Sequence, residues 1–137
     1  MDAKEQLQSI SLFSTLTPAE LTRIAPLVAD RRVAAGTVVC REGEAGHELY
    51  LIVKGEAAVE KAGAEVARLG PGEVLGELAL LDRAPRSATV TAASDLTMLV
   101  LSEQDFAALL DEIPSLPHRL LQVLARRLRD TGGGRLE

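Results

Sequence analysis

Residues 76–90 read GELALLDRAPRSATV, with one glutamate, Glu77, and one arginine, Arg86, nine positions apart on either side of an apolar run. If residues 77–80 form one helical turn, its first N–H groups lack internal acceptors and favour an anion such as phosphate. The Arg86 guanidinium can hold two phosphate oxygens, whereas the acceptor-only Glu77 carboxylate suits a sugar hydroxyl. The spacing therefore indicates either a sugar-phosphate site or a simple ion pair between two surface charges.

This stretch lies within residues 30–101, where short β-rich runs alternate with glycine-bearing turns. The runs are TVVCRE, ELYLIV, EAAVE, EVARL, SATVTA and LTMLVL. Strands this short at near-regular spacing are typical of a small barrel or sandwich and not of a βαβ architecture. The pattern predicts an antiparallel, jelly-roll-like β-roll of about eight strands, which leaves few free edges.

The segment before the strands, residues 1–29, has the pattern of helices. Thr17 and Glu20 form a potential capping box, and Pro18 suits the first helical position. We expect Pro26 to kink or shorten the helix that follows.

Residues 102–130 again have a helical pattern. Ser102 with Asp105 resembles a capping box, and Pro114 and Pro117 mark a break before a second helix. This second helix, over 115–130, is amphipathic and needs an apolar surface to cover. Its apolar face is predicted to hold Leu120, Leu124 and Leu128.

The composition bounds the possible functions. The net charge of -5, the pI near 5.1 and the lack of tryptophan argue against a nucleic-acid binder. Cys40 is the single cysteine, which favours a reducing cytoplasm, and no apolar run is long enough to span a membrane. His47 and His118 are too far apart for the metal site of a cupin enzyme, and no nucleophile stands beside a base. We therefore expect neither a metal site nor enzymatic activity.

A longer stretch, VLGELALLDRAPRSATV (74–90), resembles the phosphate-binding cassette of cyclic nucleotide-binding domains. These domains occur in bacterial catabolite activators, cyclic-nucleotide-dependent kinases and cyclic-nucleotide-gated channels. Upstream, GTVVCREGEAGHELYLIVKGEAAV (36–59) is similar to the first strands of the family. The resemblance implies one α+β domain over 1–137, made of helices at 1–29, a β-roll at 30–101, helices at 102–130 and a tail at 131–137.

The resemblance also implies roles for individual residues. Arg86 would pair with the cyclic phosphate, with help from Ser87 and the Ala79 N–H, and Glu77 would accept from the ribose 2′-hydroxyl. A serine at position 87 occurs in cAMP binders, so cAMP is favoured over cGMP. The implied nucleotide-binding residues are Leu75, where the family often has phenylalanine, Gly76, Glu77, Leu78, Ala79, Arg86 and Ser87.

In the family the last helix closes over the base as a lid. The candidates for contact with the purine are Leu120, Leu124, Arg126 and Arg127. Packing of these leucines on the roll, or on a second subunit in a homodimer, is the alternative.

The prediction is thus a cyclic nucleotide sensor that needs no cofactor and controls an effector domain or protein absent from this chain. The alternative function is a nucleotide-free β-roll that serves as a protein-interaction scaffold.

Overall fold

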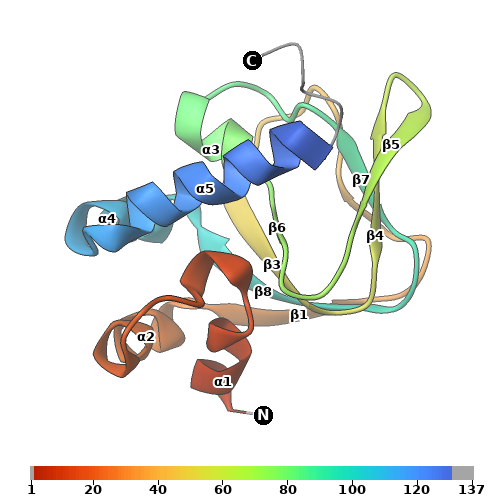
Figure 1. The fold of residues 1–137 in the computed structure, drawn as a ribbon. Coiled ribbons are helices and arrows are strands. Elements are labelled where there is room, and N and C mark those ends of the chain that lie inside the picture. The colour runs from red at the N-terminus through yellow and green to blue at the C-terminus, as the bar shows by residue number, and fades with distance from the viewer. Residues whose placement is uncertain (1, 131–137) are drawn as a thin grey trace.

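The computed structural model describes residues 2–130, in which helices precede and follow a β-roll along the chain (Figure 1). The N-terminal helices are α1 (Ala3–Gln8), the 3₁₀ turn η1 (Ser11–Phe13), α2 (Pro18–Ile24) and the 3₁₀ turn η2 (Ala25–Leu27). The strands are β1 (Ala29–Val33), β2 (Val38–Cys40), β3 (Glu48–Lys54), β4 (Ala57–Lys61), β5 (Ala64–Leu69), β6 (Val74–Leu75), β7 (Thr89–Ala92) and β8 (Leu96–Ser102). The remaining helices are α3 (Glu77–Asp82), α4 (Glu103–Glu112) and α5 (Ser115–Asp130).

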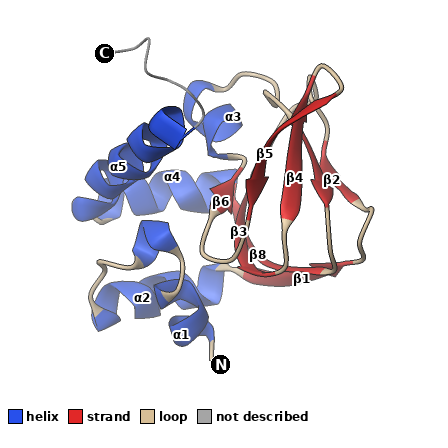
Figure 2. Ribbon diagram, turned by 45° about the vertical axis from the view of Figure 1, so that its right-hand side comes forward, coloured by secondary structure: helices blue, strands red, loops and turns tan. Residues whose placement is uncertain are grey.

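The strands form two sheets, and within each sheet all paired strands are antiparallel. One sheet has the order β1-β8-β3-β6 and the other the order β2-β7-β4-β5. The helices gather on one side of the molecule and the strands on the other (Figure 2). The predicted α+β fold with an antiparallel β-roll is confirmed.

Strand alternation divides the buried residues into two cores. Along β3, Leu49 and Leu51 pack with the helices, whereas Tyr50 and Ile52 face the inside of the roll. Successive side chains of a strand point to opposite faces, so both faces of β3 are buried. Strand β8 is divided in the same way. Leu99 belongs to the core between the sheet and the helices (the helical core), and Met98 to the core inside the roll (the roll core). The sheet β1-β8-β3-β6 is therefore the wall between the two cores.

The helix boundaries follow the local signals. Thr17 and Glu20 make both bonds of the predicted capping box, and α2 ends at Ile24, before Pro26. Ser102 accepts a hydrogen bond from Asp105 N at the start of α4, which is one half of a capping box. Pro117 lies inside the first turn of α5, so Pro114 alone marks the break.

Helix α5 packs on the N-terminal helices. Leu116 and Leu120 are buried in the helical core, and the Arg119 guanidinium donates to Ser11 O at 3.0 Å. Of the predicted apolar face, Leu120 is buried, whereas Leu128 is 50% exposed and the neighbouring Leu121 is 66% exposed. Among residues 2–130, no helix is long and apolar enough to cross a lipid bilayer.

Candidate functional site

The junction of β6 and α3 presents the first half of the site. Gly76 has φ of 92°, a left-handed conformation that lets the chain turn from β6 directly into the helix. An ideal Cβ at Gly76 would lie 2.3 Å from Arg86 Nη1, so a side chain there would displace the arginine. Glycine is thus required at position 76 both for the turn and for the approach of Arg86.

Arg86 lies in the loop between α3 and β7 and is buried, with 6% of the residue exposed. Its guanidinium donates to Glu48 O at 2.9 Å and to Gly76 O at 3.0 Å, and lies 5.6 Å from the centre of the Tyr50 ring. Its main chain is also fixed, because Arg86 N donates to Glu44 O at 2.7 Å. Within the described part of the chain, no acidic side chain is bonded to this buried cation.

A second glycine leaves room for the same side chain. An ideal Cβ at Gly46 would lie 2.4 Å from Arg86 Nε and 2.5 Å from Arg86 Cζ. The guanidinium therefore lies against two residues without side chains. A guanidinium has five N–H donors, and two of those of Arg86 are used by carbonyl groups, which leaves donors for an anion.

Glu77, the first residue of α3, is also buried, with 3% exposed. It forms an ion pair with Arg127 from α5, and does not pair with Arg86. Burial raises the pKa of the Glu77 carboxyl, while the charges of Arg127 and Arg86 act in the opposite direction. The surface ion pair between Glu77 and Arg86, which the spacing alone allowed, is not formed.

The other residues predicted from the cassette have different positions. Leu75 is buried in the roll core, whereas Ser87 is exposed beside Arg86. Leu78 and Ala79 lie in α3, but their side chains are outside the described part of the structure. Their predicted contact with a phosphate therefore stays a prediction.

The four candidate lid residues lie in different surroundings. Leu120 is buried in the helical core, and Leu124 packs against the same core. Arg127 reaches the Glu77 carboxylate, while Arg126 is exposed. Arg127 is thus the lid candidate that the structure brings to the cassette.

Sequence reasoning missed Glu48, Tyr50 and Gly46 as parts of the site. The local pattern here predicts only a glycine-bearing turn followed by the strand-like run ELYLIV. Strand alternation places Tyr50 on the same face as Ile52, and Tyr50 is the single tyrosine of the chain. The close approach of Gly46 to Arg86 joins segments 40 residues apart, so no local pattern reveals it.

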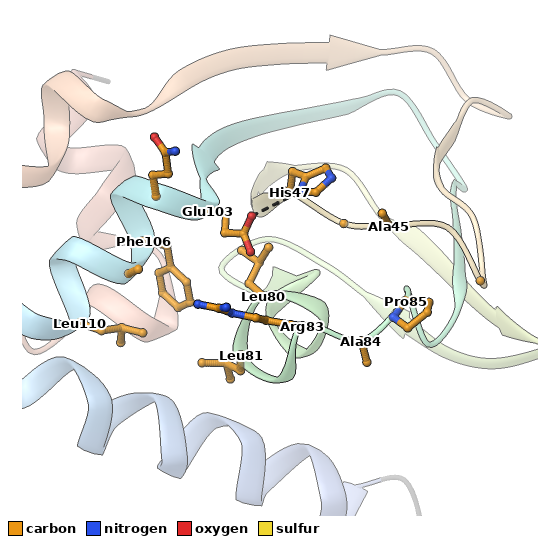
Figure 3. Close-up of a pocket in the computed structure, with 14 residues that line it drawn as sticks. Ala45, His47, Leu80, Leu81, Arg83, Ala84, Pro85, Glu103, Phe106 and Leu110 are labelled. Carbon is orange, nitrogen blue, oxygen red and sulfur yellow. Dashed lines mark hydrogen bonds and ion pairs between the residues drawn. The ribbon is translucent and has the colours of Figure 1, made fainter.

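A cavity of about 680 Å³ lies on the other side of α3, between that helix, the loop before β3 and α4 (Figure 3). His47 Nδ1 and Glu103 Oε2 are 3.3 Å apart at its edge. Its lining also includes Leu80, Leu81, Arg83 and Phe106, but neither Glu77 nor Arg86. Gly46 is also in its lining, so the cavity borders the predicted ligand site without including its two charged residues.

The two histidines and the cysteine do not form hydrogen bonds with Arg86 or Glu77 among the described residues. His47 and His118 are both exposed, and Cys40 is a partly buried residue of β2, where burial raises the pKa of its thiol. Within residues 2–130, no three His, Cys, Asp or Glu side chains come together as metal ligands would.

Comparison with known proteins identifies the relatives of this arrangement. Residues 30–113 match the family model of the cyclic nucleotide-binding domain. A cAMP-dependent protein kinase regulatory subunit of Hypocrea atroviridis is 38% identical over 113 residues, which is 82% of this chain and 24% of the relative. The cyclic AMP receptor protein of Thermus thermophilus is 36% identical over 124 residues, which is 87% of this chain and 57% of the relative.

Solved structures agree with the sequence comparison. The regulatory domain of Toxoplasma gondii PKA, crystallised with cAMP, has a TM-score of 0.70 and 35% identity to this chain. That match covers 78% of this chain and 42% of the other. The sequence described here thus spans about a quarter to three fifths of the length of these relatives.

Proposed function

Because the chain belongs to the cyclic nucleotide-binding domain family, we propose that it is a sensor that binds a cyclic nucleotide between α3 and the inside of the β-roll. The buried Arg86 guanidinium supports this most directly. Among the described residues its guanidinium donates only to two neutral carbonyl groups, and burying a cation without a counter-ion is costly. A cyclic phosphate would supply the missing negative charge through charge-assisted hydrogen bonds.

Glu77 is proposed to accept a hydrogen bond from the ribose 2′-hydroxyl. A carboxylate has two oxygens and about four acceptor positions. Glu77 can therefore accept from Arg127 and from a hydroxyl group at the same time. Its position at the start of α3, directly after Gly76, supports this role, because the Gly76 carbonyl accepts a hydrogen bond from Arg86.

We expect cAMP to bind more tightly than cGMP. Ser87 is compatible with cAMP, and the names of the kinase subunit, the receptor protein and the Toxoplasma gondii structure all refer to cAMP. The proposed response is a movement of α5, because its Arg127 contacts the carboxylate that receives the ribose. A ligand shifts α5 only by as much as it binds one position of the helix better than the other.

The test is a calorimetric titration with cAMP and with cGMP, on the unaltered chain and on Arg86→Ala. We expect Arg86→Ala to weaken cAMP binding roughly 10- to 150-fold, which corresponds to about 1.5–3 kcal/mol for a hydrogen bond to a charged group. Arg83→Ala is the matched control, because Arg83 is exposed and lies in the same loop. No heat at millimolar nucleotide would reject the sensor and favour the protein-interaction scaffold.

The effector is proposed to lie outside this chain, in a further domain or in a separate protein. A homodimer through α5 is a second proposal, supported by the exposed side chains of Leu121 and Leu128. Light scattering during size-exclusion chromatography would show a dimer mass, and a monomer at high micromolar concentration would reject it. A cytoplasmic location stays a prediction from the single cysteine.

A further inference from the structure

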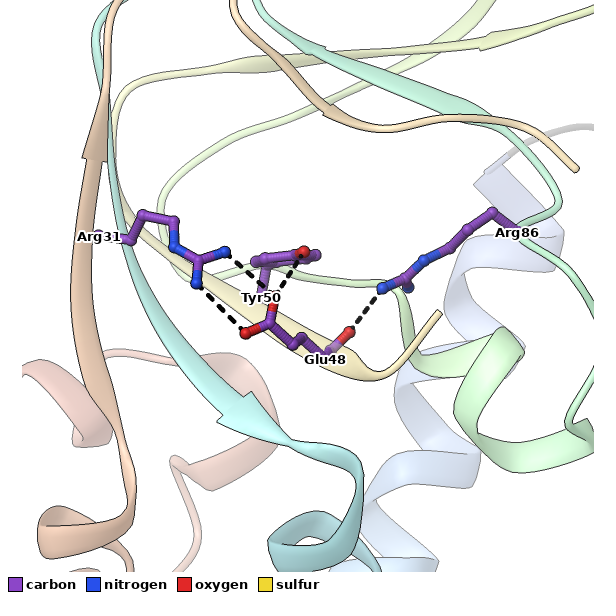
Figure 4. A network of polar contacts seen from close by, with 4 residues as sticks. All are labelled: Arg31, Glu48, Tyr50 and Arg86. Atoms are coloured by element: carbon purple, nitrogen blue, oxygen red, sulfur yellow. Dashed lines mark hydrogen bonds and ion pairs between the residues drawn. The ribbon is translucent and has the colours of Figure 1, made fainter. Parts of the chain in front are cut away.

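Four side chains form a polar network on the inner face of the roll, next to the proposed phosphate site (Figure 4). Arg31 of β1 donates to both carboxylate oxygens of Glu48, at 3.1 and 3.2 Å. The Tyr50 hydroxyl donates to Glu48 Oε1 at 3.1 Å. Arg86 donates to the main-chain carbonyl of the same Glu48. Glu48 is therefore the residue that all three others contact.

Strand register explains why the network lies inside the roll. Arg31 is paired with Met98 of β8, and Met98 is paired with Ile52 of β3. Directly paired residues of antiparallel strands share a face, and Met98, Ile52 and Tyr50 all belong to the roll core. Arg31 thus projects from an edge strand onto the face on which Arg86 lies.

Glu48 holds Arg86 through its carbonyl group and is itself held through its side chain. It is the first residue of β3 and follows the glycine-bearing loop 43–47. Its main chain is paired with Ser102 of β8, and the two bonds from Arg31 and the bond from Tyr50 fix its side chain as well. The hydrogen bonds from Arg31 also lower the pKa of the Glu48 carboxyl, which keeps this carboxyl ionised.

Tyr50 adds a second connection. Its ring centre lies 5.8 Å from Arg31 Cζ and 5.6 Å from Arg86 Cζ. Both distances are within the range of attraction between a cation and an aromatic face. The ring therefore lies between the two guanidinium groups, one paired with a carboxylate and one that contacts no acidic side chain within the described part of the chain.

We propose that Arg31 and Tyr50 are positioning residues for Arg86, acting through Glu48, and so contribute to recognition of the cyclic phosphate without touching it. This inference rests on the proposed function, because it assigns the phosphate to Arg86. It predicts that a change at Arg31 weakens the part of the binding that depends on phosphate.

The experiment compares Arg31→Gln with Arg32→Gln in calorimetric titrations with cAMP and with adenosine, which has no phosphate. Arg32 is the matched control, since it is exposed and neighbours Arg31 on β1, and its side chain therefore points away from the roll core. We expect Arg31→Gln to weaken cAMP binding about two- to fivefold, the size of a partly exposed ion pair, and to leave adenosine binding unchanged. Arg32→Gln should change neither affinity.

A double variant separates positioning of Arg86 from general loosening of the fold. In a chain that already carries Arg86→Ala, Arg31→Gln should weaken cAMP binding no further, because no guanidinium remains to be positioned. An equal loss in both backgrounds would overturn the proposal, and so would equal losses for cAMP and adenosine. Thermal unfolding without ligand checks that each variant is folded.

Tyr50 offers a readout that needs no ligand. It is the single tyrosine, and the chain has no tryptophan, so ultraviolet-excited tyrosine emission reports on this ring alone. Arg31→Gln should change this emission and Arg32→Gln should not, and identical emission from the two variants would contradict the network. An unaltered chain that binds no cAMP would overturn the proposed function and this inference together. Normal cAMP binding by Arg31→Gln would overturn this inference alone.

Discussion

Arg86 is placed by two neighbours that have no side chains. Gly46 and Gly76 come from different segments, and a Cβ at either position would overlap the guanidinium. Binding sites are often described by the groups that they present, but here the absence of two methyl groups decides where the cation lies. The spacing between Glu77 and Arg86 predicts both poles of the site, yet it contains no information on Gly46.

The role of Gly46 is testable by adding a single methyl group. Gly46→Ala should displace Arg86 and weaken cAMP binding roughly tenfold or more, the usual effect of losing a hydrogen bond to a charged group. Gly70→Ala is the control, because an ideal Cβ at Gly70 meets nothing within 4 Å. Calorimetry on the two variants makes the comparison, and equal affinities would show that Arg86 does not need the space.

The two glutamates of the site should affect stability in opposite ways as pH changes. Burial raises the pKa of Glu77 above the ordinary 4.5, although Arg127 and Arg86 lower it. The folded chain then holds a proton that the unfolded chain has lost, so the free energy of unfolding falls as pH rises through the window just above 4.5. Glu77→Gln should lack this fall.

For Glu48, Arg31 lowers the pKa below 4.5, with smaller contributions from Tyr50 and Arg86. The folded carboxylate stays ionised where the unfolded one binds a proton, so its stabilising effect is present above pH 4.5 and is lost as pH falls further. Urea unfolding of Glu77→Gln, Glu48→Gln and the unaltered chain across this range measures both effects. The slope of the unfolding free energy against pH should change in opposite directions in the two variants, relative to the unaltered chain. Changes of the same sign would contradict the assignments.

Among the elements, α5 differs most from its prediction. Its bounds, 115–130, agree with the sequence pattern, because the proline before it and the apolar periodicity are local signals. Its contacts do not follow from such signals. Leu120 is one of the residues predicted as candidates for contact with the purine base, but it is buried against the N-terminal helices. The ion pair between Arg127 and Glu77 joins residues 50 positions apart, and no spacing rule predicts it.

Two neighbouring leucines of α5 test this placement of the helix. Leu120→Ala removes a buried side chain, with 4% of the residue exposed, and should lower the free energy of unfolding by about 2–5 kcal/mol. Leu121→Ala removes one that is 66% exposed and should change it by about 0.5 kcal/mol or less. Chemical denaturation compares the two variants, and similar losses would mean that α5 packs differently.

At the scale of the whole molecule, the sequence predicts the β-roll well because its signals are repeated. Six short β-rich runs are separated mostly by glycine-bearing turns, so several weak local patterns support the same architecture. The pattern does not predict how the buried residues divide between the two cores. The helical core and the roll core share one sheet, and this division depends on which helices cover which face.

The burial of β3 and β8 on both faces has a consequence for the rate at which amide protons exchange with solvent. These two strands are the inner strands of their sheet, so their amides should exchange only when the whole domain unfolds. The outer strand β5, with mostly exposed side chains, should exchange through local opening and much faster. Exchange measured by mass spectrometry would contradict this if β3 and β5 lost protection together. The strand that holds Glu48 and Tyr50 beside Arg86 is thus expected to be among the slowest parts of the protein to open. The proposed nucleotide would then enter and leave without local unfolding of this strand.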